Sequence, residues 1–115
     1  MLFRSRLAEL GPTLVSDEIY DGLVYDGART TSALTLPGDS FVLDGFSKRY
    51  AMTGFRLGWV VTPESAMRRM QILQQNLFIS ASSFVQSAGI AALEEGAAMA
   101  TEMQDRKSTR LNSSH

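Results

Sequence analysis

The sequence predicts an α/β fold, because it combines three short apolar strand-like runs with segments of helical periodicity on either side of them. Residues 13–15, 40–44 and 58–62 are short, apolar and bounded by glycine-containing or polar connections, as strands are. Residues 3–10 and a longer segment from Glu64 onward space their apolar residues as helices do. A chain of 115 residues can bury one modest core.

The first helix and strand occupy the amino-terminal part of the sequence. Gly11 and Pro12 end the helical pattern of residues 3–10, which we expect to be the tail of a helix that begins earlier. The run 13–15 does not alternate with polar residues, which suits a strand buried on both faces. Asp17 stands at its carboxyl end, where open parallel sheets bind ligands.

The second and third strands, 40–44 and 58–62, are separated by a stretch without clear helical period. These strands could be neighbours joined by a tight antiparallel excursion rather than by a helical crossover. The residues alone leave both arrangements open.

The helix after the third strand has a strong start signal in Thr62 as cap, Pro63 at the first helical position and Glu64 near the positive end of the dipole. Its apolar residues recur at near-helical spacing and predict an amphipathic helix packed on the sheet; they are Met67, Met70, Leu73 and Leu77. Residues 80–83 interrupt the pattern, and an alanine-rich helix over 84–95 could end at Gly96.

Residues 106–115 change character, because they contain a single aliphatic residue. We expect them to be disordered and non-native, since they resemble the translation of sequencing-adapter DNA, and we assign the domain to residues 1–105. The alternative is a natural polar tail.

Composition excludes several kinds of chemistry. The net charge of −1 implies neither nucleic acid nor another strongly charged partner. The chain has no cysteine and its one histidine is His115, so disulfides, thiolate catalysis and a histidine-based metal or triad site are unavailable. No apolar run approaches a membrane span and the start lacks a signal peptide, so we expect no membrane association and a cytoplasmic location.

The most informative residue is Lys48, which follows the second predicted strand. Ser47 precedes it, and a Gly-x-Arg-x-Gly turn containing Arg56 comes eight residues later. These residue types are what a pyridoxal phosphate site needs: the amine forms a Schiff base with the aldehyde, the guanidinium pairs with phosphate, and glycines let the backbone approach closely.

A second motif, residues 16–20 with the sequence Ser-Asp-Glu-Ile-Tyr, lies about thirty residues upstream of Lys48. With both motifs in this order, the chain resembles class I/II aminotransferases, the aspartate aminotransferase-like group of fold type I pyridoxal phosphate enzymes. The resemblance implies a partial large domain, from its middle to its carboxyl-terminal part, of three-layer α/β/α architecture with a mostly parallel sheet. It also implies a homodimeric parent that transfers an amino group from an amino acid to a 2-oxo acid.

The resemblance gives individual residues their expected roles. Lys48 is the catalytic residue that holds the cofactor and moves the proton, Asp17 pairs with the pyridine nitrogen, and Tyr20 donates to the phenolic oxygen. Arg56 binds the phosphate as a bidentate fork, with Ser47 as a second phosphate contact. Gly45 departs from the family, which often has a serine three residues before the lysine. Arg49 carries no family role and is interpreted as a solvated charge.

Three alternatives stay open. The parent could catalyse another fold type I reaction, as a C–S β-lyase, a decarboxylase or an aminocyclopropane carboxylate synthase-like enzyme, because substrate contacts decide which bond breaks. It could be the non-catalytic aminotransferase-like part of a transcription regulator. The chain could also be a truncated product without its own function, and we expect it to be inactive, poorly soluble and partly ordered in isolation.

Overall fold

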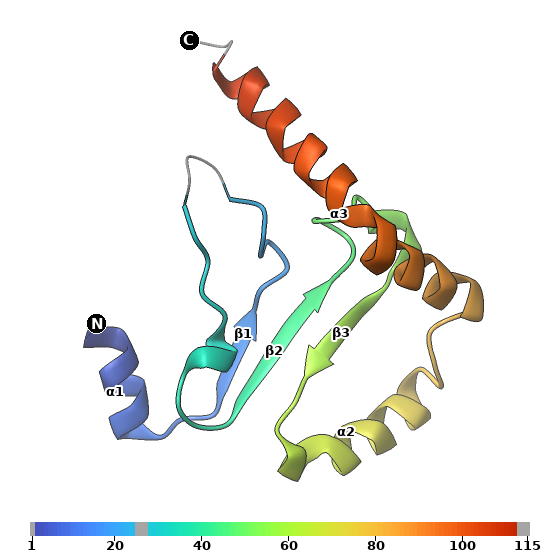
Figure 1. The fold of residues 1–115 in the computed structure, drawn as a ribbon. Helices are drawn as coiled ribbons and strands as arrows, with labels where there is room; N and C mark the ends of the chain where they lie inside the picture. Colours follow the sequence, from blue (N-terminus) through green and yellow to red (C-terminus); the bar gives the residue numbers. More distant parts are fainter. Residues whose placement is uncertain (1, 25–27, 113–115) are drawn as a thin grey trace.

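The computed structural model describes residues 2–24 and 28–112 (Figure 1). The three strands follow one another between the first and second α-helices, with one short 3₁₀ turn in each connection between strands. The elements in chain order are α1 (Leu2–Leu10), β1 (Leu14–Asp17), η1 (Ala33–Thr35), β2 (Ser40–Gly45), η2 (Thr53–Phe55), β3 (Gly58–Val61), α2 (Glu64–Leu77) and α3 (Ser83–Asn112).

The three described strands form one mixed sheet in the order β1-β2-β3. Strands β1 and β2 are parallel, with Asp17 opposite Leu43. Strands β2 and β3 are antiparallel, with Gly45 opposite Gly58. The second and third strands are therefore neighbours joined without an α-helical crossover. The carboxyl ends of β1 and β2 lie side by side at the same end of the sheet, the upper end in Figure 1.

The prediction that the first strand is buried on both faces is wrong for this structure. Val15, in the middle of β1, is 63% exposed, and the burial of the strand alternates from residue to residue. Among the described residues β1 pairs only with β2 and so stands at a sheet edge. An apolar run without alternation indicates the environment for which a strand is suited, but packing depends on the elements that cover it.

The small core of the described residues is formed by η1, β2 and the connection that follows β2. Its buried apolar side chains are Ala33, Val42, Phe46 and Met52. The Phe46 ring packs edge-on against Trp59 with centroids 5.0 Å apart, and lies 5.4 Å from the ring of Tyr50. This aromatic cluster supports the connection from β2 to β3.

Helix α2 forms where the periodicity predicts it, but its start and its packing differ from the prediction. The N-cap is Pro63, and the Thr62 hydroxyl donates to the Pro63 carbonyl instead of capping the helix. Figure 1 shows α2 beyond the end of β3 rather than on the sheet. Met67 and Leu77 are 44% and 67% exposed. The spacing identifies the apolar face of a helix, whereas its neighbours are set by the short turn that follows β3.

Helix α3 is longer than predicted. It passes Gly96 and continues to Asn112, so residues 106–112 are helical here rather than disordered, and residues 113–115 lie outside the described residues. One glycine costs a helix only about 1 kcal/mol relative to alanine, and good helix formers surround this one. That the domain ends at residue 105 and that the tail is non-native stay predictions. No helix among the described residues has the length and apolarity needed to cross a bilayer.

Candidate functional site

Two consecutive turns follow β1 and carry the first predicted motif. Asp17, exposed at the end of the strand, accepts a hydrogen bond from the Ile19 amide at its Oδ1 atom over 3.2 Å. The Asp21 amide donates to the Glu18 carbonyl (2.7 Å), and the Leu23 amide donates to the Tyr20 carbonyl (3.0 Å). The second turn requires a positive φ, 76°, which Gly22 supplies. These turns present Tyr20 at the surface, where it is 63% exposed.

The second motif forms the connection between β2 and β3, residues 46–57, which we call the lysine connection. The Phe46 amide donates to the Leu57 carbonyl (3.2 Å) and closes the base of this connection. Inside it, the Ala51 amide donates to the Lys48 carbonyl (3.3 Å), and the Thr53 hydroxyl donates to the Ser47 carbonyl (2.9 Å). Lys48 thus stands at the first position of a hydrogen-bonded turn, with its side chain exposed.

The structure brings the two motifs together at one point. The Lys48 Nζ atom lies 5.5 Å from the centroid of the Tyr20 ring. This distance suits a cation–π contact and places an amine beside a phenol. The parallel pairing of β1 and β2 produces the contact, because it sets the turns after β1 beside the connection after β2.

Arg49 is a second link between the motifs, and the sequence reasoning missed it. A Cβ atom on Gly22 would lie 3.2 Å from the Arg49 Cζ atom, so the guanidinium packs directly against the turn after β1. The same guanidinium lies 5.8 Å from the Tyr50 ring centroid. Arg49 is exposed but is packed rather than merely solvated, and only the missing side chain of Gly22 gives it room.

Two other predicted site residues have their own local geometry. Arg56 is exposed, adopts the left-handed conformation (φ 54°, ψ 45°), and its Nη1 atom donates to the Thr53 carbonyl over 3.0 Å. Ser47 is half-buried beside Lys48. Within residues 2–24 and 28–112, no hydrogen bond or ion pair joins these residues to each other or to Lys48.

The structure gives a physical reason for the departure from the family at Gly45. A Cβ atom there would lie 3.0 Å from both the Gly58 Cα atom and the Leu57 carbonyl oxygen. A Cβ atom on Gly58 would likewise approach the Asp44 carbonyl oxygen to 2.9 Å. The two strands therefore approach each other closely at this pair, and a serine at position 45 would require their backbones to move apart by a few tenths of an ångström.

Helix α3 crosses the lysine connection, as Figure 1 shows. Phe84 stacks on Phe55 with ring centroids 6.1 Å apart and planes 18° from parallel. A Cβ atom on Gly89 would lie 2.6 Å from the Leu57 Cδ2 atom, and one on Gly96 would lie 2.9 Å from the Tyr50 Cδ1 atom. The two glycines are seven residues apart and share one helix face. The glycine-and-alanine composition was visible in the sequence, but its packing role was not.

Two carboxylates near the turns have shifted pKa values in opposite directions. Burial raises the pKa of Glu18, but hydrogen bonds from the Ala33 amide and the hydroxyls of Ser32 and Ser16 outweigh it, so the net pKa is lowered below 4.5. Burial raises the pKa of Asp44 above 3.8, and its hydrogen bond from the Gly45 amide only partly compensates.

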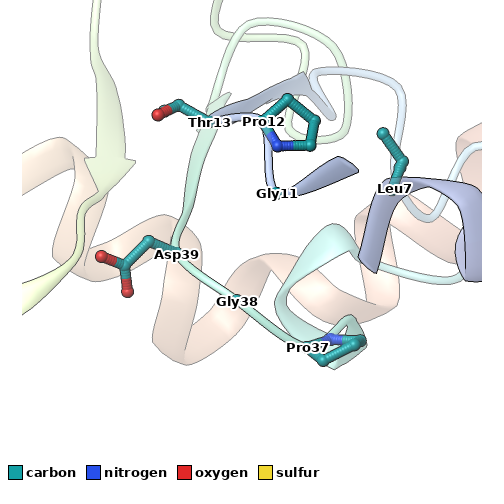
Figure 2. A pocket seen from close by; sticks show the side chains of 7 residues that line it. All are labelled: Leu7, Gly11, Pro12, Thr13, Pro37, Gly38 and Asp39. Carbon is teal, nitrogen blue, oxygen red and sulfur yellow. The ribbon is translucent and has the colours of Figure 1, made fainter. Parts of the chain in front are cut away.

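A hollow of about 350 Å³ lies at the opposite edge of the sheet (Figure 2). Leu7, Gly11 and Pro12 lie on one side of it and residues 37–39 on the other. Thr13 and Asp39, which also line it, precede β1 and β2 respectively, so this hollow is at the amino ends of the strands. It is therefore separate from the Lys48 and Tyr20 site.

The fold and the two motifs define the chain as part of an α/β protein with a lysine site at the carboxyl edge of its sheet. Residues 5–114 match the family profile of aminotransferase class I and II, and the chain belongs to this family.

Individual relatives agree with this assignment. The chain is 44% identical over 87 residues to a (5-formylfuran-3-yl)methyl phosphate transaminase from Methanocaldococcus jannaschii. The matched region covers 73% of this chain and 23% of that relative. The chain is also 44% identical over 80 residues to a valine–pyruvate aminotransferase from Mycobacterium tuberculosis, covering 69% and 21%. The crystal structure of an aminotransferase from Mycobacterium tuberculosis superimposes with a TM-score of 0.84 at 34% identity, covering 96% of this chain and 31% of that one.

These matches confirm the predicted family and fold class. The chain spans less than a quarter of the length of both curated relatives. The described sheet contains one parallel and one antiparallel pairing, so the mostly parallel character expected of the large domain is not visible in these three strands alone.

Proposed function

We propose that this chain carries the cofactor anchor of a pyridoxal phosphate-dependent aminotransferase, with Lys48 as the anchoring residue. The observation that carries the proposal is the approach of the Lys48 amine to the Tyr20 ring, 5.5 Å from its centroid. Two motifs distant in sequence thereby supply an amine and a phenol to one place. Family membership supports the same interpretation.

The donor set fits pyridoxal phosphate chemically. Lys48 offers an exposed primary amine for the aldehyde, and none of the described ion pairs engages that amine. Tyr20 offers a hydroxyl to the phenolic oxygen. Asp17 uses Oδ1 to accept from the Ile19 amide and keeps Oδ2 for the pyridine nitrogen. Arg56 and Ser47 offer a guanidinium and a hydroxyl to the phosphate.

When bound, pyridoxal phosphate supplies an aldehyde that takes up the amino group and a ring that accepts electrons from the substrate α-carbon. The chain's own residues would hold the cofactor and move protons. Lys48, as a free amine, would take the proton from the substrate α-carbon at its Nζ atom and deliver it to the C4′ atom of the cofactor. The Asp17 carboxylate would keep the pyridine nitrogen protonated, and the Tyr20 hydroxyl would orient the ring by donating to its oxygen.

The relatives extend well beyond the matched region, so amino-group transfer is proposed for a polypeptide of their length. Its substrates would be an amino acid and a 2-oxo acid, in keeping with relatives named as transaminases and as a valine–pyruvate aminotransferase. We propose a cytoplasmic homodimer for that polypeptide. The chain itself would provide the anchor without measurable turnover.

An absorbance scan of the purified chain with pyridoxal phosphate tests the anchor. We expect a visible band that borohydride abolishes, and we expect it to be lost in Lys48→Ala. The Lys107→Ala variant is the matched control, because Lys107 is the only other lysine of the chain. A band that survives in Lys48→Ala and disappears in Lys107→Ala would refute the proposal.

A further inference from the structure

Glu18 lies between Asp17 and Tyr20 in sequence, and its carboxylate accepts several hydrogen bonds. Its Oε1 atom accepts from the Ala33 amide over 2.7 Å and from the Ser16 hydroxyl over 3.0 Å. The Ser32 hydroxyl also stabilises the carboxylate. Ser16 is its neighbour on the same strand face, whereas Ala33 and Ser32 come from the segment that carries η1.

The backbone of Glu18 is held as firmly as its side chain. Its amide donates to the Leu43 carbonyl over 2.8 Å and extends the pairing of β1 with β2 by one residue. Its carbonyl accepts from the Asp21 amide over 2.7 Å and opens the turn that presents Tyr20. The conformation of this residue therefore determines where the chain leaves the sheet.

A second contact joins the same two segments. The Thr30 hydroxyl donates to the Asp21 Oδ1 atom, so residues 30–33 are attached to the turn after β1 at two points. Ala33 is also one of the four buried apolar side chains of the described residues. The Glu18 carboxylate thus connects the turn to the core.

We propose that Glu18 is a positioning residue for the candidate cofactor site. Its carboxylate fixes the segment around Ala33 against the end of β1, and this holds the turn that presents Tyr20 to Lys48. The inference rests on the proposed function, which it deepens by assigning a role to a residue that would not touch the cofactor.

The charges around Glu18 determine how this connection responds to pH. Asp21 and Asp44 are the carboxylates that face it, and Arg49 offsets the charge of Asp44. The hydrogen bonds to the carboxylate keep the pKa of Glu18 below 4.5 in the folded chain. The contribution of Glu18 is therefore fully present above pH 4.5 and is lost as the pH falls through the folded value.

Two substitutions separate the hydrogen bond from the charge. Glu18→Gln keeps an acceptor oxygen for the Ala33 amide but cannot titrate, and Glu18→Ala removes the acceptor. Glu94→Gln is the control, because Glu94 is exposed on α3. Comparison of amide spectra identifies any variant that has lost its fold.

The first readout is independent of the cofactor. In the unsubstituted chain, the Ala33 amide proton resonance should shift with a midpoint below pH 4.5, and the shift should be absent in Glu18→Gln and retained in Glu94→Gln. In Glu18→Ala, hydrogen exchange at Ala33 and Asp21 should accelerate by about tenfold or more, as expected on loss of a bond to a charged acceptor. An Ala33 resonance that titrates identically in Glu18→Gln would overturn the proposal.

The second readout is the ratio of Lys48 to Lys107 labelling after borohydride reduction with pyridoxal phosphate. We expect Glu18→Ala to lower this ratio about tenfold and Glu18→Gln to restore most of it, because small misplacements cost large factors in rate. An unchanged ratio in a folded Glu18→Ala variant would refute the positioning role. Equal labelling of both lysines in the unsubstituted chain would instead refute the proposed function, while the Ala33 titration would still report on the Glu18 bond.

Discussion

Replacing Gly45 by alanine tests the close approach of strands at the base of the lysine connection. The added Cβ atom would lie 3.0 Å from the Gly58 Cα atom and from the Leu57 carbonyl oxygen, and 3.3 Å from the Ile19 Cδ1 atom. The first two are backbone atoms, so no side-chain rotation relieves the contact. The antiparallel strands must separate locally instead.

The magnitude follows from two opposing effects. Overpacking of this kind costs about 1–3 kcal/mol. The reduced flexibility of alanine in the unfolded chain offsets about 0.4–1 kcal/mol of that cost. The middle of both ranges gives a net loss of about 1.3 kcal/mol in the free energy of unfolding, which lowers the urea midpoint by about 0.5–1 M.

Trp59 is the only tryptophan and packs 5.0 Å from Phe46, next to the substituted pair, so its fluorescence is the assay. Gly54→Ala is the matched control, because a Cβ atom there meets nothing within 4 Å. It should leave the midpoint unchanged or raise it. A Gly45→Ala variant as stable as Gly54→Ala would refute the reasoning.

Two further predictions concern charge and packing around the site. Asp44→Asn keeps the acceptor for the Gly45 amide and should raise the urea midpoint at pH 7, because burial raises the pKa of Asp44 and so disfavours its ionised form in the folded chain. The gain should disappear below pH 3.8, where the Asp44 carboxyl is protonated in both the folded and the unfolded chain. A gain that persists at pH 3 would contradict this explanation. A double-mutant cycle of Phe55→Ala and Phe84→Ala should give a coupling free energy of about 0.5–1 kcal/mol for the stacked rings, and strictly additive losses would mean that α3 does not rest on the lysine connection through this pair.

The strands and helices were predictable because their signals are local. Apolar runs located β2 and β3 to within one residue, and Pro63 with Glu64 marked the start of α2. The sequence predicts too short a helix α3, because Gly96 resembles a stop signal although its surroundings favour helix. Burial was the main failure: Val15 and Leu77 are exposed because their environment depends on which elements cover them.

The candidate site was predictable only in part. The residue types around Lys48 indicate the cofactor chemistry, and the family motifs indicate that Tyr20 belongs with them. The packing of Arg49 on Gly22 and the hydrogen bonds of Glu18 to a segment fifteen residues away depend on tertiary approach, which no local pattern encodes. These contacts give packing and hydrogen-bonding roles to Arg49 and Glu18, whose residue types alone would suggest solvated surface charges.

Peptide mapping of the chain after reaction with pyridoxal phosphate and borohydride tests the central claim most directly. The chain carries two lysines, Lys48 and Lys107, so each modified peptide can be assigned without ambiguity. The proposed site requires the label on Lys48 in clear excess over Lys107, with the excess reduced in Tyr20→Ala. Equal labelling of the two lysines, or preference for Lys107, would contradict the assignment of Lys48 as the cofactor anchor.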